Sequence, residues 1–485
     1  MTILTNTTYR GALDKIATAT LMVALGALVL LAPASATADD SRTLWMASGE
    51  VGVGPIDEDI FLHLTPRLTF LRPTPLLLCD DGPGQDCESF LEASFQIPLR
   101  LRIADREPEQ GEILRREDWS DVSDFFRIIR RIEYGSADDP LHLRAGELGS
   151  ANLGHATIVN GYYNVITTDH YRLGIQGRAD QPEWGAELLV NDISHPNLVG
   201  IRGQARPSQL YDPDSDRRRV AVGASVVADF NAPTRLATIG DEPAIAGPDH
   251  LPVVEDELAT LIYGADVEWE AIRKDDWSLT PYADLNHHSR VGSGLHTGLL
   301  WSHDFGDSLR LSSRLEYRLL LDRYVPDYIG PLYEITRYQH PAYDEPGLAG
   351  PKLTAAVSFD SATRHGGFGQ VQARFADLFT LSAAFSDATG PTGADLRLRA
   401  SIDYEDRARF GAFYYQFVPG EQRLSTTLAD LVDLDGSLVV AESRIAIIGP
   451  VYAHGQLARQ WQLRDNGRFE NVHLWNAGLG AGATF

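Results

Sequence analysis

The last eleven residues, from Trp475 to Phe485, constrain the fold of this chain more than any other stretch. Every second residue in it is apolar, and the residues between them are small or polar. Strict alternation with a period of two predicts a β-strand with one apolar face. About eleven residues is also the length that a tilted strand needs to cross the hydrocarbon of a bilayer. The sequence therefore predicts a membrane-crossing strand at this end of the chain.

This stretch resembles the C-terminal strand of Gram-negative outer-membrane β-barrels, in which an alternating strand ends on a Phe. The residues that carry the resemblance are Trp475, Leu479 and Phe485. The resemblance implies a location in the outer membrane of a Gram-negative bacterium, where the barrel-assembly machinery reads these residues as an assembly signal. It further implies contact with outer-membrane lipids and lipopolysaccharide. Over the rest of the chain, the resemblance to porins is one of pattern only.

The N-terminal residues have the pattern of a secretory signal peptide. Arg10 and Lys15 precede an apolar run from Ile16 to Ala32, and small residues lead to a cleavage site near Ala38. The alternative, a membrane anchor, is disfavoured because the uncharged core is shorter than the roughly 20 residues that a spanning helix needs. We expect residues 1–38 to be the signal peptide and 39–485 to form one barrel domain with long external loops.

Composition agrees with a barrel. The chain is 44% hydrophobic with a formal net charge of −25, which is too polar for a helical membrane protein. After Ala38 no apolar run reaches the length of ~18 residues that indicates a spanning helix. In a barrel only alternate strand residues face lipid, so polar composition is expected. The strong acidity excludes nucleic acid as a partner.

Alternation recurs through the mature sequence. In Leu309–Asp322 the odd-numbered residues are nearly all apolar, and the even-numbered ones include Arg310, Arg314, Glu316 and Arg318. Similar stretches predict an all-β fold, a single transmembrane antiparallel barrel of about 18 strands, within a range of 16 to 20. A soluble all-β protein is the alternative, and it would bury the apolar faces between two sheets.

The connections between predicted strands have two lengths, which is also typical of barrels. The short ones are expected on the periplasmic side, and the long ones outside: 72–90, 149–169, 231–257 and 418–437. Residues 322–351 fit neither class, so they form a long periplasmic segment or contain a further strand. Residues 148–164, rich in Gly, Asn and Tyr, could fold into the lumen or form an ordered external loop.

One stretch breaks the alternation. In 118–133, apolar residues recur at helical spacing after a plausible N-cap at Ser120, which predicts a short amphipathic helix. This helix could lie at the membrane surface, dock beneath the barrel or fold inward. Nearby, Cys79 and Cys87 lie in one Gly- and Pro-rich loop of an exported chain, which favours a local disulfide over a metal site.

If the apolar faces meet lipid, the opposite faces line a lumen. The residues that we expect there are Arg100, Arg102, Arg144, Arg172, Arg178, Arg202, Arg310, Arg314, Arg318, Arg397, Arg399, Asp266, Glu268 and Glu316. Rows of Arg along a wet wall favour anions, because the guanidinium stays charged and presents a fixed set of donors. The alternative is that these charges pair across strands and only hold the wall together.

These features predict a porin-like channel for passive diffusion of small hydrophilic solutes, with a mild preference for anions. One alternative is a plugged barrel with a structural or adhesive role. The other is a barrel enzyme acting on lipid or peptide, for which Asp284, His287, His288, His296 and His303 are the candidates. In an extended strand His287 and His288 face opposite sides, so we expect no catalytic site, no metal and no cofactor. Solute and oligomeric state stay open.

Overall fold

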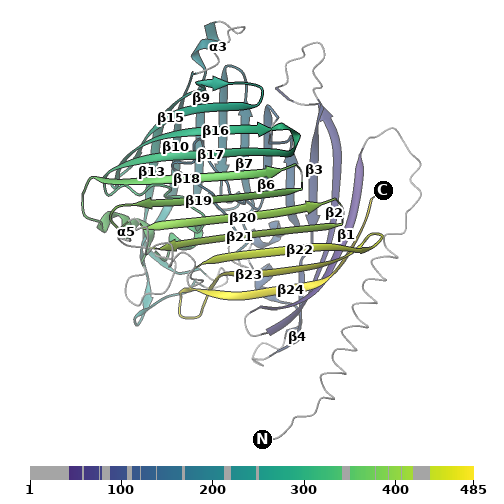
Figure 1. Ribbon diagram of the computed structural model, residues 1–485. Helices are drawn as coiled ribbons and strands as arrows, with labels where there is room; N and C mark the ends of the chain where they lie inside the picture. The colour runs from purple at the N-terminus through teal and green to yellow at the C-terminus, as the bar shows by residue number, and fades with distance from the viewer. Residues whose placement is uncertain are drawn as a thin grey trace, which may run out of the picture.

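The protein is a closed antiparallel β-barrel, seen here in a computed structural model. The structure describes residues 43–56, 59–75, 77–78, 88–105, 112–120, 122–137, 139–165, 170–211, 220–246, 251–340, 350–376, 378–391, 393–405, 407–418 and 437–484. In Figure 1 the strands β16 to β24 run side by side across one wall, and the C-terminus lies beside β1 and β2. All pairings between neighbouring strands of the main sheet are antiparallel.

The wall is built from these strand segments, in chain order: β1 (Leu44–Ile56), β2 (Asp59–Pro75), β3 (Glu88–Gln96), β4 (Leu99–Ala104), β5 (Ile129–Tyr134), β6 (Leu141–Gly146), β7 (Gly174–Asp180), β8 (Trp184–Val190), β9 (Leu198–Ala205), β10 (Val220–Leu236), β13 (Val254–Trp269), β14 (Ile272–Arg273), β15 (Trp277–His288), β16 (Gly292–Phe305), β17 (Leu309–Asp322), β18 (Arg364–Phe375), β19 (Phe379–Ala388), β20 (Ala394–Tyr404), β21 (Ala408–Val418), β22 (Leu438–Ile448), β23 (Val451–Leu463) and β24 (Phe469–Thr484). A separate pair, β11 (Thr238–Ile239) and β12 (Glu242–Pro243), lies in the connection between β10 and β13.

The barrel has 20 wall strands rather than about 18. Among the described residues the main sheet contains 22 segments. Two of these do not add a strand: β3 and β4 both pair with β2 as consecutive pieces of one strand, and β14 is a two-residue continuation that pairs with β15. The two strands that the sequence pattern missed are β1 and β5, and the residues of β5 were assigned to the helix expected over 118–133.

The cylinder closes where the first strand pairs with the last. Met46 to Val53 of β1 pair with Thr484 to Ala477 of β24. The last strand therefore has the partner that its alternating pattern required, and no edge is left open at this seam. Gly478 is needed here for a close approach, because a Cβ atom at this position would collide with the carbonyl oxygen of Val51.

The two faces of the wall differ as the alternation predicts. On β17, Leu315 and Tyr317 are 58% and 50% exposed on the outer face, whereas Arg318 on the inner face is fully buried. On β13, Tyr263 and Val267 are exposed on the outside, and Ile262 is buried inside. A closed cylinder with an apolar outer surface and polar inner faces is the arrangement of a membrane-spanning barrel.

Because the strands alternate in direction, their connections alternate between the two ends of the cylinder. The long connections 147–173, 237–253 and 323–363 share one end, which by the barrel rule is external. The other end of the cylinder carries residues 43 and 484, the described ends of the chain. It also carries the short connections at 306–308, 376–378 and 405–407. The connection at 76–87 also falls at the periplasmic end, so the expectation of an external loop at 72–90 was wrong.

The helices are few and short in the described part of the chain. They are η1 (Arg116–Trp119), α2 (Val122–Phe125), η2 (Phe126–Ile128), α3 (Pro207–Tyr211), η3 (Gly306–Ser308), α4 (Tyr333–Thr336) and α5 (Lys352–Ser358). None of the helices in these residues has the length and apolar character needed to cross a membrane.

Two expectations about irregular segments need correction. The helix expected over 118–133 is three separate turns that end at Ile128, and Ile129 and Ile132 belong to β5. Residues 323–340 of the stretch 322–351 lie at the external end and contain α4, with no further strand among them. The signal peptide at 1–38, the pair Cys79 and Cys87, and the terminal Phe485 lie outside the described residues.

Candidate functional site

The lumen of the barrel holds a long connection that turns inward after β6. We call residues 147–165 the first inner loop. Its ends are held together by the two backbone hydrogen bonds between Ala151 and Tyr162. Gly154 and Gly161 adopt positive φ angles of 56° and 69°, which let the chain fold back tightly between them. The loop contacts inward-facing residues of β8, β13, β15, β17 and β20, so the inward alternative is the one that the structure shows.

A second connection packs against the first. Residues 323–340, the second inner loop, pair with it through a parallel bridge between Val159 and Ile329. The hydroxyl of Tyr162 also donates a hydrogen bond to Glu334. Around this contact the two loops share a buried apolar cluster with β8, β9, β10 and β13, which includes Leu148, Ile158, Tyr328, Tyr333, Leu189, Leu198, Val227 and Ile262. The loops therefore form a packed body inside the barrel, not a loose lid.

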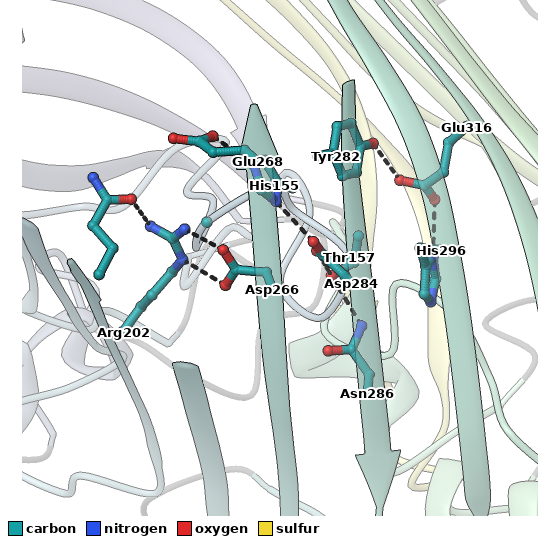
Figure 2. Close-up of polar contacts among 12 residues, drawn as sticks. His155, Thr157, Arg202, Asp266, Glu268, Tyr282, Asp284, Asn286, His296 and Glu316 are labelled. Atoms are coloured by element: carbon teal, nitrogen blue, oxygen red, sulfur yellow. Dashed lines mark hydrogen bonds and ion pairs between the residues drawn. The ribbon is translucent and has the colours of Figure 1, made fainter. Parts of the chain in front are cut away.

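His155, in the first inner loop, is the polar anchor of this body (Figure 2). Its Nδ1 lies 2.8 Å from Oδ1 of Asp284, and its Nε2 lies 2.9 Å from Oε2 of Glu268. Ionised carboxylates only accept hydrogen bonds, so an imidazole that bonds two of them must carry both protons. Burial opposes the charge, but the bonds to Asp284 and Glu268 outweigh it and raise the pKa of His155 to about 9.

The neighbouring carboxylates are also engaged. Arg202 of β9 donates to both oxygens of Asp266, at 3.2 and 2.7 Å, and to Glu187 at 3.1 Å. Thr157 donates to the second oxygen of Asp284 at 2.8 Å. The ligand atoms of His155, Asp266 and Asp284 lie within 4.8 Å of one another, a spacing that a metal ion could bridge. Here, however, those atoms are used in ion pairs and hydrogen bonds within the protein.

A second polar network adjoins the first across β15, β16 and β17 (Figure 2). The ring of Tyr282 stacks on that of His155 with centroids 4.2 Å apart, and its hydroxyl donates to Glu316 at 2.6 Å. Glu316 also lies 2.9 Å from Nδ1 of His296 and accepts from Arg318 at 2.5 Å. Arg318 bonds Asp327 of the second inner loop at 3.0 Å. This network ties the inner loops to the wall.

Two of the larger cavities among the described residues lie in the lumen beside the inner loops. The first, which we call the arginine cavity, has a volume of about 440 Å³ and lies between the first inner loop and β18 to β21. Its lining includes Arg314, Arg397 and Arg399, together with Gln370, Gln372, Ser382 and Ser401, and the aromatic rings of Tyr163, Phe368 and Phe413. None of the described residues that line it is a carboxylate.

The arginines of this cavity are held in place by the inner loop. Arg314 is 7% exposed, donates to the backbone oxygen of His155 at 2.6 Å and stacks over Phe368 at 3.9 Å. Its Nη2 has no hydrogen-bond partner among the described residues. Arg399 donates to the hydroxyl of Tyr163 at 2.6 Å, and no carboxylate of the described chain pairs with it. Arg397 is ion-paired with Asp395 at 2.8 Å, and Arg314 lies 3.9 Å from Glu316. The uncompensated positive charge of the cavity is therefore that of Arg399.

The second cavity, the mixed cavity, has a volume of about 560 Å³ and lies against β1, β2, β4 and β22 to β24. Its charged lining residues have both signs: Arg67, Arg100, Arg130, Arg409, Arg444, Glu50, Glu147 and Glu442. Arg67 lies 3.8 Å from Glu50, whereas Arg444 stacks over Tyr452 at 3.7 Å. Both cavities are polar, as a path for hydrophilic solutes requires.

The residues predicted to line the pore fall into three groups. Arg100, Arg314, Arg397 and Arg399 line the two larger cavities. Buried or nearly buried in ion pairs are Arg102 with Asp59, Arg172 with Glu334, Arg202 with Asp266, Arg318 with Glu316, and Glu268 with His155. The others lie elsewhere on the wall: Arg144 bonds the backbone of Glu147, Arg178 bonds Asp180, and Arg310 bonds Asp304. Arg172 lies two residues before the start of β7.

Of the histidines considered for an enzyme, His296 lies opposite Asp284 on the neighbouring strand, but its Nδ1 bonds Glu316. His287 bonds Ser293, whereas His288 is buried and bonds Thr260. His303 packs between Trp301 and Phe305, away from Asp284. Asp284 instead bonds His155 of the first inner loop. No sequence pattern had singled out His155 as a site residue. The loop pattern around His155 gave no sign of this partner, and the same is true of Asp327, Glu334 and Arg337 in the second inner loop.

Comparison with solved structures finds only distant similarities. Pseudomonas aeruginosa OccK5 (OpdH) is 11% identical over 92% of this chain and 98% of its own, with a TM-score of 0.33. Pseudomonas aeruginosa OpdK, solved with vanillate, is 9% identical over 92% of this chain and 99% of its own, with a TM-score of 0.33. Acinetobacter baumannii OccAB3 is 9% identical over 92% of this chain and 100% of its own, with a TM-score of 0.32. No family model and no curated protein sequence matches this chain.

The location follows from the barrel itself. Closed antiparallel barrels with an apolar outer band and a polar lumen are built into the outer membranes of Gram-negative bacteria. The chain is a protein of this type, and its outer membrane location agrees with the pattern of its last strand.

Proposed function

We propose that the chain is an outer-membrane channel through which small hydrophilic solutes diffuse passively, with a mild preference for anions. The observation that supports this most directly is the arginine cavity, a polar space inside the barrel that is lined by three guanidinium groups and by no carboxylate of the described residues. The inner loops occupy the side of the lumen at β9 to β17 and leave this space along β18 to β21.

The physical reason for anion preference is the fixed charge. Arg399 faces the cavity without a carboxylate partner in the described chain, and a guanidinium stays protonated at any physiological pH. Fixed positive charge on a wet wall raises the local concentration of anions. The preference is mild because the mixed cavity carries both signs.

Planar-bilayer recordings test the path through the arginine cavity. Ser401 lines this cavity, so Ser401→Trp should narrow the path and lower the single-channel conductance. Ser313→Trp is the matched control, because the odd-numbered face of β17 is the outer face, and its conductance should equal that of the wild type. A wild-type protein that conducts but is insensitive to Ser401→Trp would show that solutes take another route.

A plugged barrel with a structural or adhesive role is the second candidate. The dense packing of the two inner loops favours it, since Val159 and Ile335 are fully buried and the loops are bonded to the wall at several places. Folded protein that inserts into bilayers without producing conductance steps would support this candidate and reject the channel.

We also propose that residues 1–38 are removed on export and that Cys79 and Cys87 form a disulfide. Both proposals rest on sequence pattern. The intact mass of the purified protein, measured before and after reduction and alkylation, tests them together. A mass that retains residues 1–38, or two thiols that alkylate without reduction, would contradict the respective proposal.

A further inference from the structure

The connection between β4 and β5 exposes apolar side chains and buries several charged ones, which is unusual for a loop in water. We call its described part, residues 112–120 and 122–128, the wall segment. Four of its charged residues are buried: Arg115, Asp118, Asp124 and Arg127 are exposed by only 5%, 0%, 3% and 4%. Arg116 is exposed and forms an ion pair with Glu112 at one end of the segment. Its apolar residues are exposed: Ile113, Val122 and Phe125 by 71%, 65% and 55%. Water-soluble loops show the opposite arrangement.

The charged side of the wall segment is fixed by one carboxylate. Oδ1 of Asp118 accepts hydrogen bonds from Nη1 of Arg100, Arg115 and Arg127, at 2.6, 2.8 and 3.3 Å. Nη2 of Arg127 donates a further hydrogen bond to Oδ1 of Asp124 at 3.1 Å. Arg100 lines the mixed cavity, so this network lies on the lumen side of the segment. The apolar side therefore faces away from the lumen.

The wall segment continues the barrel wall. Its backbone bonds β4 from Arg102 N to Ile113 O at 2.6 Å and from Arg115 N to Arg100 O at 3.0 Å. A bridge pairs Leu101 with Leu114, which places both side chains on one face. That face is the outer one, because Arg100 and Arg102 alternate with Leu101 and point inward. β5 pairs with β3, so the segment occupies the position of a neighbouring strand beside β4.

We propose that the wall segment is part of the membrane-facing wall and that its apolar side contacts lipid acyl chains of the outer leaflet. The argument for lipid as the occupant is continuity. The exposed face of Leu114, at 41%, extends the outer band formed by Ile103, at 40%, on the adjoining strand. The segment follows the external end of β4, so this contact lies in the outer leaflet. Of the three positions that the sequence left open for the stretch 118–133, this is the one at the membrane.

Site-directed fluorescence of the full-length protein tests this placement. Val122→Cys and Phe125→Cys, each made with Cys79→Ser and Cys87→Ser, would carry a bimane label in phosphatidylcholine vesicles. Brominated acyl chains quench the label from the lipid side, and iodide quenches it from water. Leu315→Cys on the lipid face of β17 is the membrane control. Asp241→Cys, exposed in the connection between β11 and β12, is the aqueous control.

We expect labels at 122 and 125 to lose emission with brominated chains to the same extent as at 315, and to be as well protected from iodide. Iodide quenching like that at 241 would overturn the proposal and place the segment in water. Protection from both quenchers, with crosslinks to a second copy of the chain, would also overturn it and assign the surface to an oligomer. Heat-modifiable migration in gels confirms that each variant is folded. The result does not depend on whether the lumen conducts.

Discussion

At the scale of single residues, the charge state of His155 decides how the first inner loop is held. Its two carboxylate partners raise its pKa to about 9, above the ordinary value of 6.5. The resulting stabilisation is fully present below pH 6.5 and is lost as the pH rises through about 9; it amounts to about 3 kcal/mol at most. NMR titration of the His155 imidazole should therefore give a midpoint near the higher value.

A matched variant separates this charge from packing. His155→Gln keeps a polar side chain of similar size but cannot become cationic. We expect its melting temperature to lie below that of the wild type at pH 6 and to approach it at alkaline pH, as the wild type loses its extra proton. A difference that stays constant with pH would contradict the role of the charge.

Arg399 should control charge selectivity more than arginines outside the lumen do. Arg399→Gln removes an uncompensated charge from the arginine cavity. A unit charge about 4 Å from an ion in water contributes about 1 kcal/mol, so the anion preference should fall by at most about fivefold. Reversal potentials in a salt gradient measure this change. Arg235→Gln, which removes an exposed arginine paired with Glu255 and Asp256, should leave the potential unchanged.

The sequence could identify some of these residues but not their partners. Alternation placed Arg314 and Glu316 on the inner face of β17 because strand faces are a local property. The contact between His155 and Asp284 joins residues 129 positions apart, and no local pattern records it. Arg318 was expected to line an open lumen, yet it is fully buried because the second inner loop brings Asp327 against it.

At the scale of elements, the first inner loop should limit the open cross-section of the barrel. Removing residues 150–163 and joining the ends with a short glycine linker would delete His155 and the contacts to the second inner loop. We expect the single-channel conductance to rise severalfold, because the loop fills lumen that water would then occupy. An unchanged conductance, in a variant that still migrates as a folded barrel, would show that the loop does not obstruct the path.

The seam between β1 and β24 should be intolerant of side chains at Gly478. Gly478→Val would drive the new Cβ into the backbone of Val51, and overpacking of this kind costs about 3 kcal/mol or more when backbone must move. We expect a large loss of heat-modifiable, folded barrel in refolding assays. Gly49→Val is the control on the same seam, since nothing lies within 4 Å of a Cβ at that position. Equal folding yields for the two variants would argue against the close approach.

The helix expected over 118–133 shows why elements were harder to predict than faces. Val122 and Phe125 do lie in a helical turn, but Ile129 and Ile132 lie in β5. Apolar residues three positions apart fit a helix, and a short strand with one bulge satisfies the same spacing. The register shift between β3 and β5 at Phe95 is such an irregularity. Only pairing with β3, which is distant in sequence, determines the strand.

At the scale of the whole molecule, the apolar outer surface predicts how the protein behaves on extraction. Outward residues such as Leu315, Tyr317 and Trp475 are 48% to 58% exposed, which in water would be unfavourable for so extended a surface. We expect the protein to stay in the membrane fraction after alkaline carbonate treatment and to enter solution only with detergent. Release by carbonate alone would mean that another layer of protein covers these faces.

The class of the fold could be read from the sequence, whereas its strand number could not. The last strand and β17 alternate over long stretches, and such strands require a closed sheet in lipid. On the side of β5 to β8 the strands are short, and the wall segment replaces a regular strand. The residues of β5 also fit helical spacing, and β1 was not recognised as a strand, so the estimate of about 18 strands was low.

The pairing of the first strand with the last has a consequence for biosynthesis. A polypeptide that ends before β24 lacks the second partner of β1, so the unpaired backbone groups of β1 remain available to other chains or to proteases. Only a chain that includes β24 can satisfy the hydrogen bonds on both sides of β1 and close the ring.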